Sequence, residues 1–125
     1  MPKAREVKIE ERRRTERKEV LETFHVFLVI PHIGLRKIYL KDVSEGGLGF
    51  IAESSDKFKK HEIIECFFYL NPSLRLPLKI KVMHVSEENG ESRIGCEFSE
   101  TSSRAYKAFA AFLGLLDDLA AFVET

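Results

Sequence analysis

The sequence predicts an all-β domain with one C-terminal helix: a six-stranded antiparallel β-barrel capped by that helix. Short runs of β-branched and aromatic residues alternate with turn signals through the middle of the chain, and the last segment carries apolar residues at spacings of three and four. A chain of 125 residues with 44% hydrophobic content suits one domain with one core. We therefore expect a single domain over 1–125, with an arm over 1–20, a barrel over 21–99 and a helix over 100–125.

The arm is basic and has few apolar residues, so it has no face to bury and we expect it to be flexible. Glutamates are interspersed among its cations, and the whole chain is neutral, with 20 Lys+Arg and 20 Asp+Glu. This balance argues against a general nucleic-acid binder. A small barrel that binds oligonucleotides is further disfavoured because no aromatic platform is evident. We expect no nucleic-acid partner.

Six strands follow the arm, each rich in β-branched or aromatic residues and bounded by turn formers. They are expected at residues 23–30, 35–40, 48–53, 63–70, 76–86 and 93–98. The first two are predicted to form a hairpin, because the four residues between them include Pro31 and Gly34.

Two later turns and one alternation define the rest of the barrel. Asn71-Pro72-Ser73 separates the fourth strand from the fifth, and Asn89-Gly90 favours a tight hairpin between the fifth and sixth. Within the fifth strand the period-two pattern places Leu78, Ile80 and Val82 on one face, with His84 next in the same register.

The C-terminal helix is predicted to begin after a cap at Ser99, Thr101 or Ser102. Its apolar stripe comprises Tyr106, Phe109, Phe112, Leu113, Leu116, Leu119, Phe122 and Val123. We expect core packing for Phe109, Phe112, Leu113 and Leu116. The stripe is wide for a lone helix, so contact of its last turns with a partner, or with a second copy in a homodimer, is the alternative to core packing there.

Cysteine usage and the absence of long apolar runs indicate the compartment. Cys66 and Cys96 lack CxxC spacing and lie in apolar runs, which is typical of buried thiols in a reducing environment. The charged first 20 residues exclude a signal peptide, and no apolar stretch reaches the 18 or so residues of a membrane span. We expect a cytoplasmic protein without membrane insertion.

Catalysis and metal binding are not supported by any local pattern. The four histidines show no HxH or HExxH spacing, so we expect no metal site and no cofactor. His25 and His84 are placed on strand faces, and His32 and His61 in loops. Ser44 has no nucleophile-elbow context. We therefore expect a protein that is not an enzyme.

Two motifs remain, separated by 24 residues. The first is R-x-x-x-R, from Arg13 to Arg17. An arginine side chain presents paired donors that match phosphate oxygens, and it can also bind the guanine edge or stack on a purine. Taken alone, an arginine run at a terminus is equally typical of a solubilising segment.

The second motif is D-x-S-x-x-G, from Asp42 to Gly47. The Asp42 carboxylate can accept bonds from the N–H edge of guanine, and Ser44 adds a short donor and acceptor beside it. Gly46 and Gly47 permit positive φ and a close approach of ligand to backbone. Taken alone, the motif is equally typical of a plain interstrand turn.

In this order, on this strand pattern, the two motifs resemble the signature of the PilZ domain family, bacterial receptors for the second messenger cyclic di-GMP. The resemblance extends over essentially the whole chain and includes a late G-x-x-F pattern, matched by Gly95 to Phe98. It implies the PilZ-like split-barrel fold, a nucleotide ligand, and a signal passed to a partner protein. A PilZ-like adaptor that works without nucleotide is the alternative.

Carried over to this chain, the resemblance implies a set of ligand residues. Arg13 and Arg17 would engage the phosphates and guanine faces. Arg12 holds the position of an arginine found in members that bind an intercalated ligand dimer. The guanine pocket on the barrel wall would be lined by Asp42, Ser44, Gly46 and Gly47.

Overall fold

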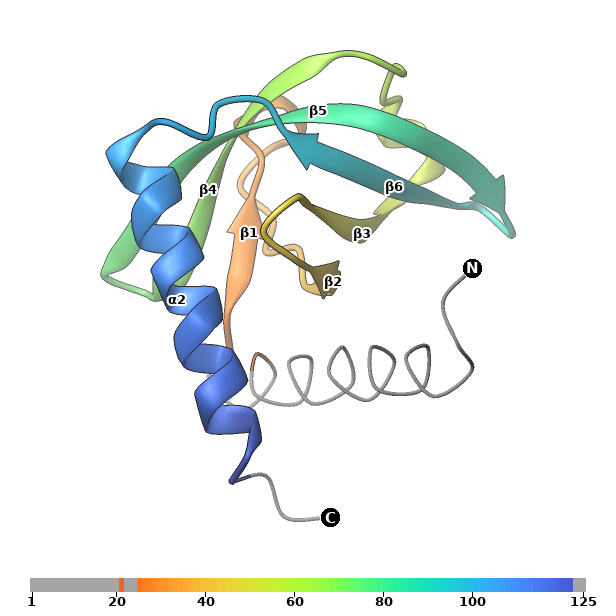
Figure 1. Ribbon diagram of the computed structural model, residues 1–125. Helices are drawn as coiled ribbons and strands as arrows, with labels where there is room; N and C mark the ends of the chain where they lie inside the picture. The colour runs from red at the N-terminus through yellow and green to blue at the C-terminus, as the bar shows by residue number, and fades with distance from the viewer. Residues whose placement is uncertain (1–20, 22–24, 123–125) are drawn as a thin grey trace, which may run out of the picture.

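The computed structural model describes residue 21 and residues 25–122. In chain order its strands are β1 (Phe27–Val29), β2 (Leu40–Val43), β3 (Gly47–Glu53), β4 (Ile63–Asn71), β5 (Leu74–Glu88) and β6 (Glu91–Phe98). Two short 3-10 helices, η1 (Pro31–Ile33) and η2 (Ser54–Asp56), lie in connections, and α2 (Arg104–Ala120) follows the last strand. Figure 1 shows the strands curling round one interior, with α2 along one side.

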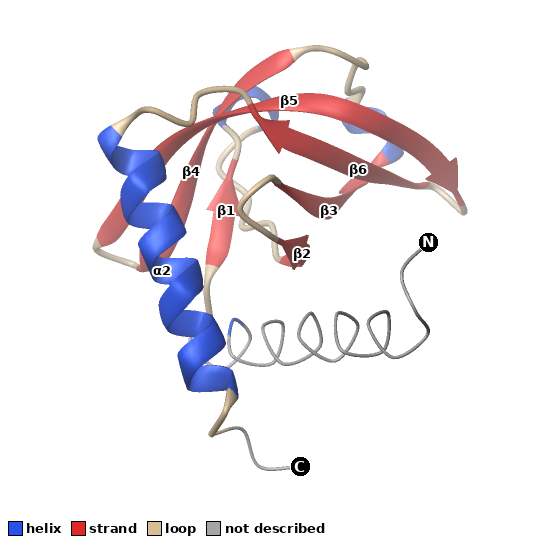
Figure 2. Ribbon diagram, in the orientation of Figure 1, coloured by secondary structure: helices blue, strands red, loops and turns tan. Residues whose placement is uncertain are grey.

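All six strands belong to one antiparallel sheet, in the order β1-β4-β5-β6-β3-β2. The sheet curls into a half-barrel, so its two edge strands approach each other (Figure 2). One pair of backbone hydrogen bonds joins the edges: Leu28 and Ile38 each donate to the other, at 2.8 Å. The predicted fold class, six antiparallel strands with one C-terminal helix, is confirmed.

The predicted hairpin between strands 23–30 and 35–40 is wrong in detail. Between these segments the chain forms η1 and then turns at Gly34, whose φ is 100°. Among the described residues of the two segments, this detour leaves only the Leu28–Ile38 bridge, and Leu35 is 88% exposed. The second strand instead begins at Leu40 and pairs with β3.

Both later turns form as predicted. Asn89 and Gly90 have φ values of 53° and 80°, so the two residues between β5 and β6 adopt the positive angles that favour a tight hairpin. The Asn71 side chain accepts hydrogen bonds from the backbone N–H groups of Ser73 and Leu74, both at 2.8 Å, and so turns the chain between β4 and β5.

Helix α2 covers the interior of the half-barrel. Ser103 caps its first turn by accepting from the backbone N–H of Tyr106 at 3.0 Å, so the cap lies later than predicted. The Phe109 ring packs on Phe68 of β4 and Phe98 of β6, with ring centroids 4.9 and 5.0 Å apart. The described part of the chain contains no helix long and apolar enough to cross a membrane.

The predicted core stripe of α2 is largely confirmed. Phe109, Leu113 and Leu116 are fully buried, whereas Phe112 is only partly buried. The end of the helix differs from the predicted range of 100–125. Helix α2 ends at Ala120, and Phe122 just beyond it is 82% exposed. Val123 lies outside the described residues.

Cys66 and Cys96 are both buried and free, as the apolar runs around them predict. Burial raises the pKa of each thiol to about 12, and the neighbouring Cys96 adds to the shift for Cys66. Both thiols are therefore protonated near neutral pH, and they pack as small apolar groups.

The packing of α2 predicts a difference between two phenylalanines of the same segment. Phe109→Ala should lower the free energy of unfolding by about 3 to 5 kcal/mol, because it empties a site enclosed by the barrel and the helix. Phe122→Ala, the matched control at an exposed position, should change it by less than about 0.5 kcal/mol. Denaturant titration of both variants measures the difference, and equal losses would contradict this packing.

Candidate functional site

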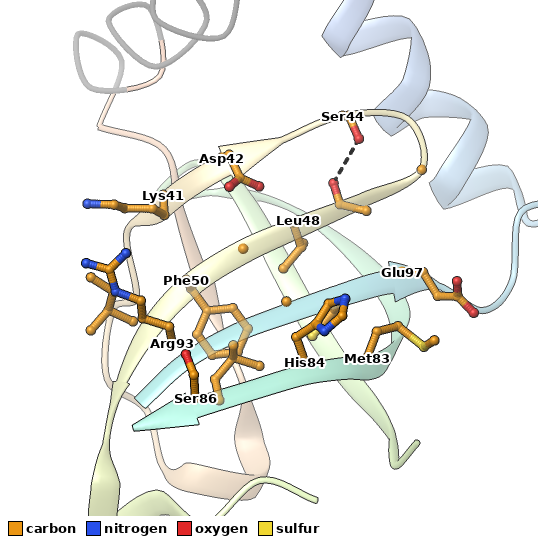
Figure 3. Close-up of a pocket in the computed structure, with 17 residues that line it drawn as sticks. Lys41, Asp42, Ser44, Leu48, Phe50, Met83, His84, Ser86, Arg93 and Glu97 are labelled. Atoms are coloured by element: carbon orange, nitrogen blue, oxygen red, sulfur yellow. Dashed lines mark hydrogen bonds between the residues drawn. The ribbon is translucent and has the colours of Figure 1, made fainter. Parts of the chain in front are cut away.

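A cavity of about 480 Å³ lies on the outer face of the sheet, over β2, β3, β5 and β6. The predicted barrel residues Asp42, Ser44, Gly46 and Gly47 all line it. Figure 3 shows Asp42 and Ser44 along one wall and His84 across the strands from them. Arg12, Arg13 and Arg17, the predicted arm residues, lie outside the described residues.

The turn between β2 and β3 is held in place by hydrogen bonds to three elements. Within the turn, the Ser44 backbone N–H donates to the Gly47 carbonyl at 2.8 Å, and the Ser44 hydroxyl donates to the same oxygen at 3.4 Å. The Gly46 carbonyl accepts from Phe98 N–H of β6 at 3.1 Å. The Tyr106 hydroxyl of α2 donates to the Glu45 carbonyl. The motif turn therefore contacts both the sheet and the helix.

Gly47 is required for packing rather than for conformation. A Cβ at this position would lie 2.1 Å from the backbone carbonyl oxygen of Cys96, a distance that no side chain can occupy. Neither Gly46 nor Gly47 is among the described glycines with positive φ, so that part of the prediction is wrong. The group that approaches Gly47 closely in the structure is the backbone of β6.

A β-bulge places Asp42 on the cavity side. Leu40 pairs with Phe50 and Asp42 with Gly49, which leaves Lys41 as the extra residue in β2. Leu40 and Val43 both face the core, while Asp42 between them is exposed. The bulge thus turns the motif carboxylate outward without removing the neighbouring apolar residues from the core.

A second bulge places His84 on the same outer face. Val82 pairs with Cys96 and His84 with Gly95, so that Met83 is the extra residue in β5. The predicted alternation holds for Leu78, Ile80 and Val82, which are buried, but it breaks before His84, which is exposed. His25 also departs from prediction, because it lies in a turn before β1 with φ of 55°.

Charged side chains are distributed unevenly along the cavity. Lys41 and Arg93 lie at one end and Glu97 at the other, with Asp42 and His84 between them (Figure 3). The prediction from sequence did not include Lys41, His84 or Arg93. Only their positions on adjacent strands bring them to the cavity, and no local motif marks them.

In the described part of the chain, no group of three or more His, Cys, Asp or Glu side chains is placed to hold a metal ion. The cavity instead combines two exposed carboxylates, Asp42 and Glu97, with two hydroxyls, two cations and an imidazole. Such a set can bind a polar, anionic ligand through several hydrogen bonds at once.

The protein is thus a small domain built on a curled antiparallel half-barrel, with a helix over its interior and a cavity beside an interstrand turn. The family model for the PilZ domain matches residues 11–114. The chain belongs to the PilZ domain family. No curated protein sequence matches it.

Three solved structures illustrate the shared fold. YcgR from Escherichia coli, in complex with c-di-GMP, has 14% sequence identity and a TM-score of 0.58, covering 77% of this chain and 42% of its own. PlzA from Borreliella burgdorferi, also in complex with c-di-GMP, has 13% identity and a TM-score of 0.51, covering 82% and 48%. The inhibitor of motility MotI/DgrA from Bacillus subtilis has 13% identity and a TM-score of 0.59, covering 72% and 46%.

In each case this chain spans less than half the length of the structure that it matches. At these identities the likeness concerns the fold.

The contact between Gly47 and Cys96 predicts that alanine substitution lowers the free energy of unfolding at one of two adjacent glycines and not at the other. Gly47→Ala should lower the free energy of unfolding by about 1 to 3 kcal/mol, because the methyl group forces β3 away from β6. Gly46→Ala should change it by less than about 0.5 kcal/mol, since the nearest atom to its Cβ is the Ser44 Oγ at 3.9 Å. Thermal or chemical unfolding of both variants checks this, and a stable Gly47→Ala protein would refute the close approach.

Proposed function

We propose that this protein binds cyclic di-GMP through its R-x-x-x-R and D-x-S-x-x-G motifs and relays the signal to a partner protein. The observation that carries the proposal is the convergence of Asp42, Ser44, Gly46 and Gly47 on one cavity of a PilZ domain. The complexes of YcgR and PlzA with c-di-GMP support it by analogy of fold.

The chemistry of the cavity fits both parts of such a ligand. A carboxylate such as Asp42 accepts two parallel N–H donors, which is what the edge of guanine offers. Lys41 and Arg93 at one end of the cavity add positive charge where a phosphate would be stabilised. In this proposal Arg13 and Arg17 of the arm complete the site, with Arg12 beside them.

Binding would couple the arm to the barrel, because the ligand contacts both. Bonds between arginine and phosphate are charge-assisted and contribute about 1.5 to 3 kcal/mol each. Such bonds would tie the arm, which has few apolar residues of its own, to the ligand on the barrel. The chemistry proposed is binding alone, without catalysis, in a cytoplasmic signalling protein.

The route from ligand to partner is proposed to run through α2. The Tyr106 hydroxyl bonds the Glu45 carbonyl of the motif turn, so a movement of that turn reaches the first turn of the helix directly. Towards the end of α2, Leu115 is exposed and Leu119 is partly buried, and Phe122, just beyond the helix, is exposed. We refer to these three residues as the α2 stripe and propose it as the output surface.

The proposed ligand site predicts that Arg13→Ala and Arg17→Ala each weaken cyclic di-GMP binding at least about tenfold, the equivalent of about 1.4 kcal/mol. Thermal stability without ligand should stay nearly unchanged. Asp42→Ala should weaken binding as well, through the loss of the guanine contact. Isothermal titration calorimetry of the full chain measures all three.

Cyclic di-AMP and GTP serve as ligand controls in the same titration, and neither should bind comparably. Wild-type affinity in both arginine variants would rule out the assignment of the arm. If the wild-type chain binds none of the three nucleotides, the nucleotide-independent adaptor becomes the better account.

If the partner that binds the α2 stripe is a second copy of this chain, the protein is a homodimer. Light scattering of the full chain should give twice the mass of one chain, and Leu115→Glu or Phe122→Glu should return it to a monomer by placing a charge in an apolar contact. Tyr39→Glu, an exposed residue on the barrel, is the matched control and should leave the mass unchanged. If the wild type is a monomer, the second copy is ruled out, and the proposed partner of the α2 stripe is a different protein.

A further inference from the structure

The outer face of the sheet carries a row of four residues across four neighbouring strands. Asp42 of β2 pairs with Gly49 of β3, Gly49 pairs with Gly95 of β6, and Gly95 pairs with His84 of β5. All four line the cavity. The two inner positions have no side chain, and the two outer ones carry a carboxylate and an imidazole.

The missing side chains let the outer two lean inward over the sheet. A Cβ at Gly49 would lie 3.0 and 3.2 Å from the two carboxylate oxygens of Asp42. A Cβ at Gly95 would lie 3.5 Å from the Cβ and 3.6 Å from the Cδ2 of His84. The carboxylate therefore lies over β3 and the imidazole over β6.

Opposed residues on adjacent antiparallel strands have Cα atoms about 4.5 to 5.5 Å apart. Asp42 and His84 lean over such a pair, so the two groups are close enough to contact one aromatic base at the same time. Figure 3 shows them on opposite sides of β3 and β6. A carboxylate binds the N–H edge of a base, and an aromatic ring binds its face.

We propose that His84 is the stacking residue for one guanine of the ligand, whose edge is held by Asp42, with Gly49 and Gly95 as the floor of the seat. The inference rests on the proposed binding of cyclic di-GMP. It adds a specificity-determining residue that neither motif contains. This arrangement requires a single planar base with paired N–H donors. A purine that has no such donors facing Asp42 would not meet the requirement.

Replacement of the ring tests the stacking role. His84→Ala should weaken cyclic di-GMP binding about 5- to 150-fold, the range for loss of an aromatic ring stacked on a base. His84→Phe keeps a ring and should bind within about threefold of wild type, whereas His84→Gln keeps only polar atoms and should resemble His84→Ala. His32→Ala, an exposed histidine outside the cavity, is the matched control and should bind as wild type.

A second variant tests the floor without removing the imidazole. Gly95→Ala places a methyl group in ordinary contact with His84, so the protein should fold normally, but the methyl group fills the space beside the ring and should weaken binding at least about tenfold. The midpoint of thermal unfolding without ligand should be unchanged for the His84 variants, because His84 is exposed, and for Gly95→Ala, because its Cβ would meet His84 only at ordinary contact distance.

Calorimetric titration with cyclic di-GMP separates the outcomes. If the wild type binds and His84→Ala binds equally well, the stacking role is refuted and the proposed function stands. If His84→Gln retains wild-type affinity while His84→Phe does not, His84 acts through a hydrogen bond and the inference is overturned. If Gly95→Ala binds cyclic di-GMP as tightly as the wild type, the proposal that Gly95 forms the floor under the base is refuted. Absence of binding in the wild type refutes the inference together with the proposed function.

Discussion

The close backbone contact between Gly47 and Cys96 determines where the site lies. It fixes the turn after β2 against β6, and the hydrogen bond from Phe98 N–H to the Gly46 carbonyl supports the same contact. Phe98 in turn packs on Phe109 and Tyr106 of α2. The motif turn, the sheet and the helix therefore form one connected body, and the ligand proposed to bind at the turn would act on all three.

Two β-bulges determine which side chains reach the cavity. Sheets alternate strictly between faces, so a strand that contributes apolar residues to the core cannot also present a neighbouring pair to solvent unless its register shifts. The bulge at Lys41 turns Asp42 outward, and the bulge at Met83 does the same for His84. Bulges commonly re-aim side chains next to functional sites, and here they do so on both sides of the same glycine pair.

This dependence on register explains what the sequence could and could not predict. The strand pattern, the Asn89-Gly90 hairpin and the core face of α2 follow from local periodicity and turn chemistry, and all three appear in the structure. The prediction of a strand over 35–40 was wrong because η1 redirects the chain before it, and local strand propensity carries no information about that change of direction. The cap at Ser103 was missed because several serines and threonines precede the helix and each has the same local preference.

The site shows the same division. Asp42, Ser44, Gly46 and Gly47 are adjacent in sequence, so a motif can mark them, and the structure places all four on the cavity. His84 is marked only by its opposition to Gly95, which depends on a bulge with no sequence signature. A period-two reading even assigns it to the core face. Because the residues proposed to bind a base from opposite sides come from different strands, a motif defines one wall of the proposed site, and the register of the sheet defines the other.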